Sequence, residues 1–226
     1  MNTEQKQIAV RAYTLAEHTG FGACFMERTS NKYLFSKTMS IATCKADMRG
    51  MSTMREGLWI AAFTPTRMTL RLAFLMHVDR ILDRADYWRK YENSRIDSIY
   101  KPNSNKRFGF EQIRNDWHGP DRQAEDMKSN RVLWSQNFMV FANSYDYRNR
   151  LPSGIKLPKR FEYMARGGMR RYGQKFEVPE SFLEWARRQH SLTTFQVIDR
   201  FEGKQHSRAG SEPKQRSTCM QGSCSR

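Results

Sequence analysis

The segment SIATCKADMR, residues 40–49, places a thiol beside several charged side chains. Its thiol, Cys44, is followed directly by the ammonium of Lys45, and then by the carboxylate of Asp47 and the guanidinium of Arg49. A neighbouring cation lowers the pKa of a cysteine and so creates a nucleophile. Adjacent strand residues point to opposite faces, however, so a strand would separate Lys45 from Cys44. A buried structural thiol is the alternative interpretation.

Catalysis by a cysteine also requires a base, and the spacing of the sequence provides none. The side chains that would be tested in an enzyme are Cys44, Asp47, His18 and Asp97. The sequence contains no P-loop, no H-E-x-x-H motif and no zinc-deaminase motif. Two thiols in CMQGSC (219–224) lack the further ligands of a structural zinc site, so neither a metal nor a cofactor is expected. Whether the protein is an enzyme stays open.

Two short segments suit contact with a nucleotide. In HTGFGACF (18–25), two glycines permit close backbone approach and flank a phenylalanine that offers a ring for stacking. Residues 100–102, Tyr-Lys-Pro, set a ring and a cation at a rigid turn. The predicted nucleotide-binding residues are Gly20, Phe21, Gly22, Lys45, Arg49, Tyr100 and Lys101. The alternatives are a core phenylalanine in a tight turn, a solvated loop and a plain edge turn.

Residues 148–175 are strongly basic, with nine lysines and arginines against one carboxylate, Glu162. Phe161, Tyr163 and Tyr172 are interleaved with these cations. Cations bind phosphates and aromatic rings stack on bases, so this composition is typical of a nucleic-acid groove. A solvated helix face is the alternative. The predicted phosphate-binding residues are Lys159, Arg160, Arg166, Arg170 and Arg171.

The hydrophobic pattern indicates the elements that must position these residues. Strands are expected over residues 6–16, 39–44, 57–63, 70–82 and 130–142, with 57–63 and 70–82 paired as a hairpin. Helices are expected over 84–91, capped by Asp83, and over 159–166, 179–189 and 192–201. This order predicts an α+β protein. Its core would be a strongly bent antiparallel or mixed β-sheet or a small barrel, with helices concentrated in the C-terminal third.

Length and charge bound the remaining possibilities. The 226 residues suit one domain, predicted over 1–203, and a disordered basic tail over 204–226. The formal net charge of +16 favours a polyanionic partner, nucleic acid before a membrane. The sequence has no long apolar run and no signal-peptide layout, and its four cysteines form no disulfide framework. We therefore expect no membrane contact and a reducing, cytoplasmic location.

Seven segments, taken in order, resemble a known family. They are GFGACF (20–25), SIATCKADMR (40–49), EGLWIAAF (56–63), RLAFLMHVDRILDRADYWRKY (71–91), DSIYKPN (97–103), NRVLWSQNFMVFA (130–142) and ARGGMRRYGQKF (165–176). The set resembles the second class of the nucleotide-modification-associated domains of bacteria and phages, over about residues 8–200. The chain departs from the family pattern at Ala46, where a proline is usual, and at Gly57-Leu58, where Gly-Asp is usual.

The resemblance implies a link to systems that modify bases in DNA. The layout of glycine, strand, turn and strand also resembles the PUA and EVE group of small β-barrels, which hold a modified base. One function left open is a non-catalytic reader or accessory that binds a nucleotide or nucleic acid, DNA in preference to RNA. The others are an enzyme that modifies a nucleobase or nucleotide, and a basic phage-type protein that binds a host factor. Abundant cations and aromatics without a catalytic pattern favour the reader.

Overall fold

The computed structural model describes residues 6–15, 24–28, 33–43, 45–64, 71–92, 94–113, 122–141, 154–167 and 174–191. The strands are β1 (Gln7–Thr14), β2 (Cys24–Arg28), β3 (Tyr33–Ile41), β4 (Trp59–Phe63), β5 (Leu72–His77), β6 (Arg80–Asp83), β7 (Tyr100–Pro102), β8 (Phe110–Gln112), β9 (Arg131–Ser135), β10 (Phe138–Val140) and β11 (Gln174–Pro179). The helices are α1 (Ala46–Gly50), α2 (Arg84–Tyr91), α3 (Gln123–Asp126), the 3-10 turn η2 (Lys159–Phe161), α4 (Glu162–Gly167) and α5 (Ser181–Ser191).

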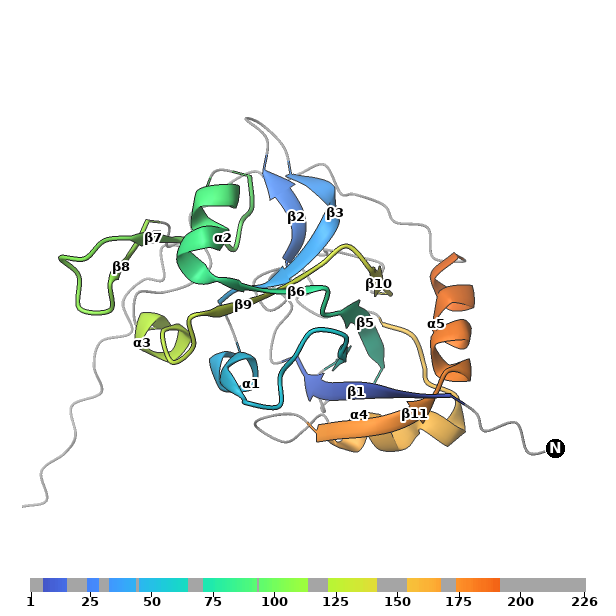
Figure 1. The fold of residues 1–226 in the computed structure, drawn as a ribbon. Helices are drawn as coiled ribbons and strands as arrows, with labels where there is room; N and C mark the ends of the chain where they lie inside the picture. Colours follow the sequence, from blue (N-terminus) through green and yellow to red (C-terminus); the bar gives the residue numbers. More distant parts are fainter. Residues whose placement is uncertain are drawn as a thin grey trace, which may run out of the picture.

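The strands form three sheets, and the described part of the chain is an α+β fold (Figure 1). Sheet A has the order β10-β5-β4-β1-β11, sheet B has the order β2-β3-β9-β6, and β7 pairs with β8 alone. None of these sheets closes into a barrel. Helices are few, and α1, α2 and α3 all precede β9, so the predicted concentration of helices in the C-terminal third is not confirmed. No described helix is long and apolar enough to cross a bilayer.

Two stretches of chain pass from one sheet to the other without a change of register. The strand predicted over 70–82 is in fact β5 in sheet A and β6 in sheet B, and β9 and β10 divide the other predicted strand in the same way. Met76 pairs with Phe138 in sheet A, and Arg80 pairs with Trp134 in sheet B, which is the same offset on both sides. We call the bend between them, residues 77–79 and 135–137, the corner.

The main hydrophobic core lies between sheets A and B. Ile60 and Met76 from sheet A meet Met39 and Leu133 from sheet B, and all four are fully buried. A second cluster covers the other face of sheet A, where the helices of the C-terminal part pack. Successive residues of β4 alternate between the two clusters, because strand side chains point to opposite faces. The apolar run of β4 is therefore buried on both faces, because β4 is the central strand of sheet A and a hydrophobic cluster covers each side of that sheet.

Several local predictions are confirmed. β4 and β5 form an antiparallel hairpin, and α2 spans the predicted residues 84–91. The carboxylate of Asp83 caps α2 by accepting a hydrogen bond of 2.7 Å from the backbone N–H of Ala85. Helices α4 and α5 match the helices predicted over 159–166 and 179–189. The helix predicted over 192–201 and the tail over 204–226 lie outside the described residues.

Gly154 lies beside the start of β5 in a position that a larger residue would disturb. Its φ is +52°, and a Cβ there would lie 2.9 Å from both the Cβ of Arg71 and the carbonyl oxygen of Leu72. We expect Gly154→Ala to lower the free energy of unfolding by about 2–4 kcal/mol, because left-handed strain and overpacking add. Urea unfolding followed by circular dichroism measures this loss.

Gly57→Ala is the matched control for that clash. Gly57 has a φ of +84°, yet a Cβ there would meet no atom within 4 Å. We expect a loss of about 1 kcal/mol, from the backbone conformation alone. Equal losses in the two variants would contradict the clash at Gly154.

Candidate nucleic-acid interface

A short amphipathic helical segment presents cations and a ring to solvent. It begins after Pro158 as the turn η2 and continues as α4. Phe161, Met164 and Ala165 have the i, i+3, i+4 spacing of one helix face, and they are buried in the cluster on sheet A. The opposite face carries the exposed side chains Lys159, Arg160, Tyr163 and Arg166. Burial of one face therefore fixes which residues the other face offers to a partner.

Tyr163 is an unusually accessible aromatic residue for this protein. It is 44% exposed, and among the described large hydrophobic residues only Ile113 is comparable. Its ring packs edge-on against Phe176 of β11, with 5.3 Å between the centroids. Partial burial raises the pKa of Tyr163 above its ordinary value. The ring is thus held in place while remaining accessible, as a stacking platform must be.

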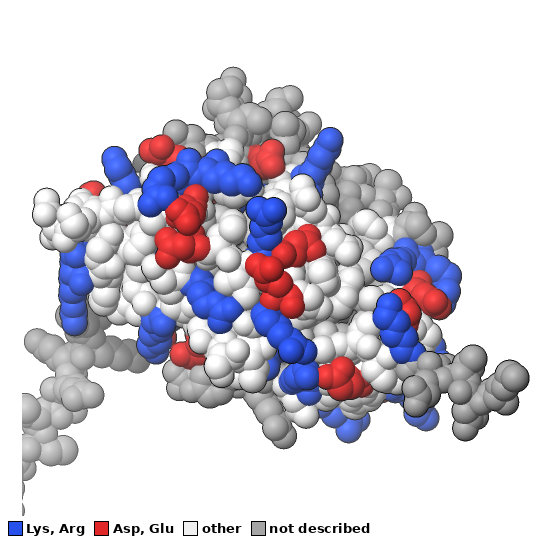
Figure 2. Space-filling view, viewed as in Figure 1, with Lys and Arg blue, Asp and Glu red and all other residues white. Residues whose placement is uncertain are grey.

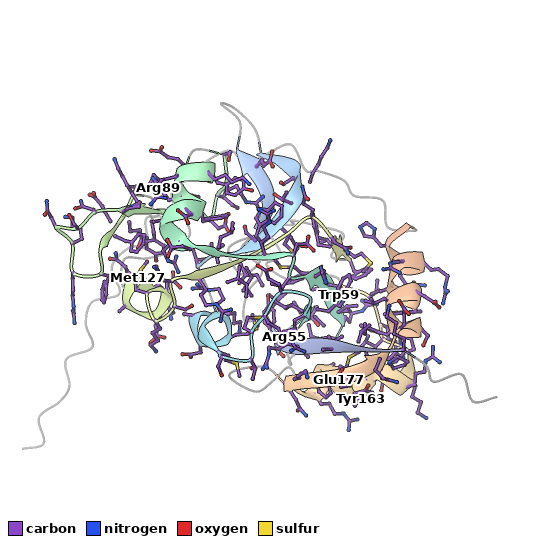
Figure 3. The ribbon with its side chains drawn as sticks, in the orientation of Figure 1. Arg55, Trp59, Arg89, Met127, Tyr163 and Glu177 are labelled. Atoms are coloured by element: carbon purple, nitrogen blue, oxygen red, sulfur yellow. The ribbon has the colours of Figure 1, made fainter. Side chains whose placement is uncertain are left out.

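Three cations lie beside this ring on the same helical segment. In the part of the chain that the structure describes, Lys159, Arg160 and Arg166 have no salt-bridge partner. Lys175 of β11 points to the face opposite Phe176 and pairs with Glu177 at 2.7 Å. Figure 3 labels Tyr163 and Glu177 at the lower edge of the molecule, and Figure 2 shows blue side chains along that edge. We call Lys159, Arg160, Tyr163, Arg166 and Phe176 the α4–β11 surface.

The structure brings together three of the five predicted phosphate-binding residues. Lys159, Arg160 and Arg166 lie on one side of a single helical segment. Arg170 and Arg171 lie outside the described residues. Tyr163 was noted in the sequence as one of several interleaved rings, and its exposure singles it out, whereas Phe161 is buried.

The predicted nucleotide site is only partly described. The residues that lie outside the described ranges are His18, Gly20, Phe21, Gly22 and Cys44. Strand β3 ends at Ile41, and the chain then enters α1, with Asp47 half-buried in its first turn. Lys45 has a left-handed φ of 61°, and its Nζ donates to the carbonyl oxygen of Thr14 at 3.1 Å. The ammonium also lies 5.0 Å from the ring centroid of Tyr13, so Lys45 joins α1 to β1.

Arg49 is a structural residue in this fold. It is fully buried, and its guanidinium donates to the carbonyl oxygens of Thr43, Asp126, Ser129 and Arg131. A guanidinium has five donors in a fixed fork, which suits it to collecting carbonyls from several chain segments. This burial replaces the expectation that Arg49 contacts phosphate at the rim of a site.

Tyr100 is likewise a poor stacking platform, because it is only 2% exposed. Its hydroxyl donates to Oδ2 of Asp126 at 2.7 Å, and the guanidinium of Arg84 lies 5.1 Å from its ring centroid. The neighbouring Lys101 is exposed on β7 and remains accessible to a partner. The predicted Tyr-Lys pair is thus divided between the interior and the surface.

Asp97 belongs to a buried polar network on the outer face of sheet B. Its two carboxylate oxygens accept hydrogen bonds of 2.7 Å from the hydroxyls of Ser40 and Tyr87. Nε of Arg95 lies 3.6 Å from the same carboxylate, and Nη2 of Arg95 donates to Ser40 at 3.0 Å. All four residues are at most 2% exposed, so a substrate has no access to them here. The network fastens α2 and residues 94–99 to β3.

We expect Asp97→Ala to lower the free energy of unfolding by about 3–5 kcal/mol, because the buried guanidinium of Arg95 would lose the carboxylate that lies 3.6 Å from it. Tyr87→Phe removes one hydroxyl from the same carboxylate and should cost about 1 kcal/mol. Urea unfolding of both variants tests this ranking. An Asp97→Ala protein as stable as the wild type would show that the network is dispensable.

A His–Asp pair that the sequence analysis did not single out lies at the corner. Nδ1 of His77 is 2.5 Å from Oδ1 of Asp79, and the imidazole lies 5.1 Å from the ring centroid of Trp59. Oδ2 of Asp79 accepts hydrogen bonds from the backbone N–H groups of Gln136 at 2.6 Å and Asn137 at 3.2 Å. The i, i+2 spacing of His77 and Asp79 in a strand pattern is the signal that could have revealed the pair.

The chemistry of this pair is that of a histidine oriented by a carboxylate, which is one part of a nucleophilic triad. Burial raises the pKa of Asp79, but the hydrogen bonds from His77, Gln136 and Asn137 outweigh it, and the pKa lies below its ordinary value. The described hydrogen bonds of Asp79 run to both sides of the corner. Its evident task is to hold the bend.

We expect Asp79→Asn to lower the free energy of unfolding by about 1–3 kcal/mol at neutral pH. Because the pKa of Asp79 is lowered in the folded state, its stabilisation is fully present above the ordinary carboxyl value of about 3.9. That stabilisation is lost as the pH falls through the lower folded value. Urea titrations from neutral pH down to about pH 2 should show the gap between the two proteins closing.

Asp86→Asn is the control, because Asp86 is an exposed carboxylate whose ion pair among the described residues is with Arg89 on α2. Such a pair contributes about 0–1 kcal/mol. A gap between wild type and Asp79→Asn that does not change with pH would contradict the role of the charged carboxylate.

Comparisons of the chain with protein-family models, with curated proteins and with solved structures found no significant match. The sequence resemblance and the geometry of the described residues therefore carry the functional argument. Within the described ranges, no group of three or more His, Cys, Asp or Glu side chains is arranged to hold a metal ion.

Proposed function

We propose that the protein binds nucleic acid through the α4–β11 surface as a non-catalytic reader or accessory. The observation that carries this proposal is the accessible ring of Tyr163, 44% exposed and fixed by Phe176. Exposed cations precede it by four and three residues, at Lys159 and Arg160, and follow it by three, at Arg166. Residues three and four apart are neighbours on a helix surface, so these cations flank the ring. A base would stack on Tyr163 while its phosphates meet the cations.

The accessible ring favours an unpaired base, because a base inside a duplex has no free face to offer. We propose DNA before RNA, since the sequence resembles domains that are linked to the modification of DNA bases. The net charge of +16 supports a polyanionic partner of either kind. Placing the protein in DNA base modification rests on the sequence resemblance alone.

We also propose that sheets A and B act together as one strongly bent sheet of the kind found around PUA-like base sites. The support for this is the register, which stays unchanged from Met76–Phe138 to Arg80–Trp134. A base site near Phe21 and Cys44 would be the second part of such a reader. It follows from the sequence resemblance alone.

Replacement of the ring tests the proposal directly. We expect Tyr163→Ala to weaken binding of a fluorescent single-stranded DNA by about 5- to 100-fold, because stacking contributes about 1–3 kcal/mol per base. Tyr163→Phe keeps the ring and should bind nearly as wild type. Fluorescence anisotropy measures affinity, and urea unfolding shows whether the alanine variant is still folded. Equal affinity of the folded alanine and phenylalanine variants would contradict stacking on Tyr163.

Paired charge removals test the phosphate contacts. The double substitution Arg160→Ala with Arg166→Ala should weaken binding. It should also make the slope of log K against log salt shallower by about 2, because each lost phosphate contact removes about 1 from that slope. Lys37→Ala with Arg55→Ala removes the same charge from exposed positions on other elements. If the two pairs lose affinity equally, the effect is one of net charge and the α4–β11 surface is not the interface.

A further inference from the structure

The hairpin of β7 and β8 projects from the body of the protein at the left of Figure 1. Each strand has three residues, and Tyr100 pairs with Gln112, Lys101 with Glu111 and Pro102 with Phe110. No other described strand pairs with this hairpin. The hairpin therefore belongs to neither of the two larger sheets.

Both ends of this short ladder are anchored, at Tyr100 beside the body and at Phe110 next to the loop. Tyr100 and Phe110 are at most 8% exposed and pack with Ile99 in a small hydrophobic cluster. The hydroxyl of Tyr100 donates to Asp126, and Nε2 of Gln123 donates to the carbonyl oxygen of Phe110 at 2.9 Å. Arg84 of α2 and residues Gln123 and Asp126 of α3 thus hold the hairpin in a fixed direction.

The loop at the tip, residues 103–109, is also ordered by its own hydrogen bonds. The backbone N–H of Asn103 donates to the carbonyl oxygen of Gly109 at 2.8 Å, and that of Gly109 donates to Lys106 at 2.8 Å. The side chain of Asn103 accepts from the N–H of Asn105 at 3.1 Å and donates to Glu111 at 3.0 Å. A preorganised loop loses little conformational entropy when it binds a partner.

The hairpin carries a basic tip. Lys101, Lys106 and Arg107 are all exposed, and the single carboxylate of the hairpin, Glu111, is already engaged by Asn103. The guanidinium of Arg107 lies 5.2 Å from the ring centroid of Phe108, so the tip offers charge rather than an open ring. The left end of the molecule in Figure 2, where Figure 1 draws the hairpin, shows blue side chains.

We propose that this hairpin is an arm that enters the major groove of double-stranded DNA, with Lys101, Lys106 and Arg107 on the phosphates. This deepens the proposed function and rests on it. The major groove admits a two-stranded ribbon and is about 8.5 Å deep. The strands themselves are packed against the body through Tyr100 and Phe110, so the part that enters the groove is the ordered loop 103–109 with Lys106 and Arg107.

The two surfaces then recognise different states of DNA. The ring of Tyr163 meets an unpaired base, and the arm, whose own ring is covered by Arg107, meets paired DNA. Their combination defines the substrate class as duplex DNA with a locally unpaired or extruded base. Fully single-stranded DNA would engage the α4–β11 surface alone.

The test compares Lys106→Ala with Arg107→Ala against the control pair Lys37→Ala with Arg55→Ala. Figure 3 shows Arg55 near the centre of the view, away from the hairpin. Anisotropy with a duplex of about 20 base pairs and with one of its strands measures both modes. We expect the hairpin pair to weaken duplex binding by about 10- to 100-fold near 0.1 M salt, because two released counterions no longer contribute. Single-strand binding should change no more than in the control.

A footprint supplies a second, direct measurement. Acetylation of lysines in the wild-type protein, with and without duplex, should show protection of Lys101 and Lys106 but not of Lys37. Equal loss of duplex affinity in the hairpin and control pairs, with no protection at Lys101 and Lys106, would overturn the arm. If hairpin variants lose duplex binding while Tyr163→Ala binds as wild type, the arm stands and the α4–β11 surface fails. Wild-type protein that binds neither DNA would overturn both proposals.

Discussion

The corner between the two sheets is the constraint on which the remaining structure depends. Two antiparallel strands change sheets at the same place and keep one register, so their bends must coincide. The carboxylate of Asp79 ties the bends together, because it accepts hydrogen bonds from the opposite strand at Gln136 and Asn137 and contacts His77 on its own. The sheets can then face each other around a shared core, with helices left for the outer faces.

Arginine has two distinct tasks in this basic protein. Arg49 and Arg95 are fully buried. Arg49 gathers carbonyl acceptors from several chain segments, and Arg95 donates to Thr38 and Ser40 of β3. The planar fork of a guanidinium allows this, because one side chain can satisfy carbonyls and hydroxyls that would otherwise be buried without donors. Arg160, Arg166 and Arg107 are exposed instead. Some of the arginines that make up the high net charge thus hold the interior together, and others are exposed where a polyanion could bind them.

The proposed binding surfaces share a physical design. In each, a hydrophobic contact fixes the element from behind, Phe161 for α4 and Tyr100 for the hairpin. The opposite side of each element then presents cations. Rigid presentation matters because phosphate contacts with exposed lysine and arginine are individually weak and lose side-chain entropy on binding. The difference lies in the rings: Tyr163 is accessible, whereas the guanidinium of Arg107 lies over Phe108.

Local patterns in the sequence determined those elements that depend on neighbouring residues alone. The apolar run at 57–63 and the alternation in 70–82 predicted the hairpin of β4 and β5, Asp83 predicted the start of α2, and residues 159–166 predicted a helix. Only the tertiary structure decided where the strands bend, because the partners of Asp79 lie 57 and 58 residues away. The same holds for Arg49, whose acceptors include carbonyls 77 to 82 residues distant. A sequence shows that a side chain can donate, but burial and partners depend on segments that meet only in the folded chain.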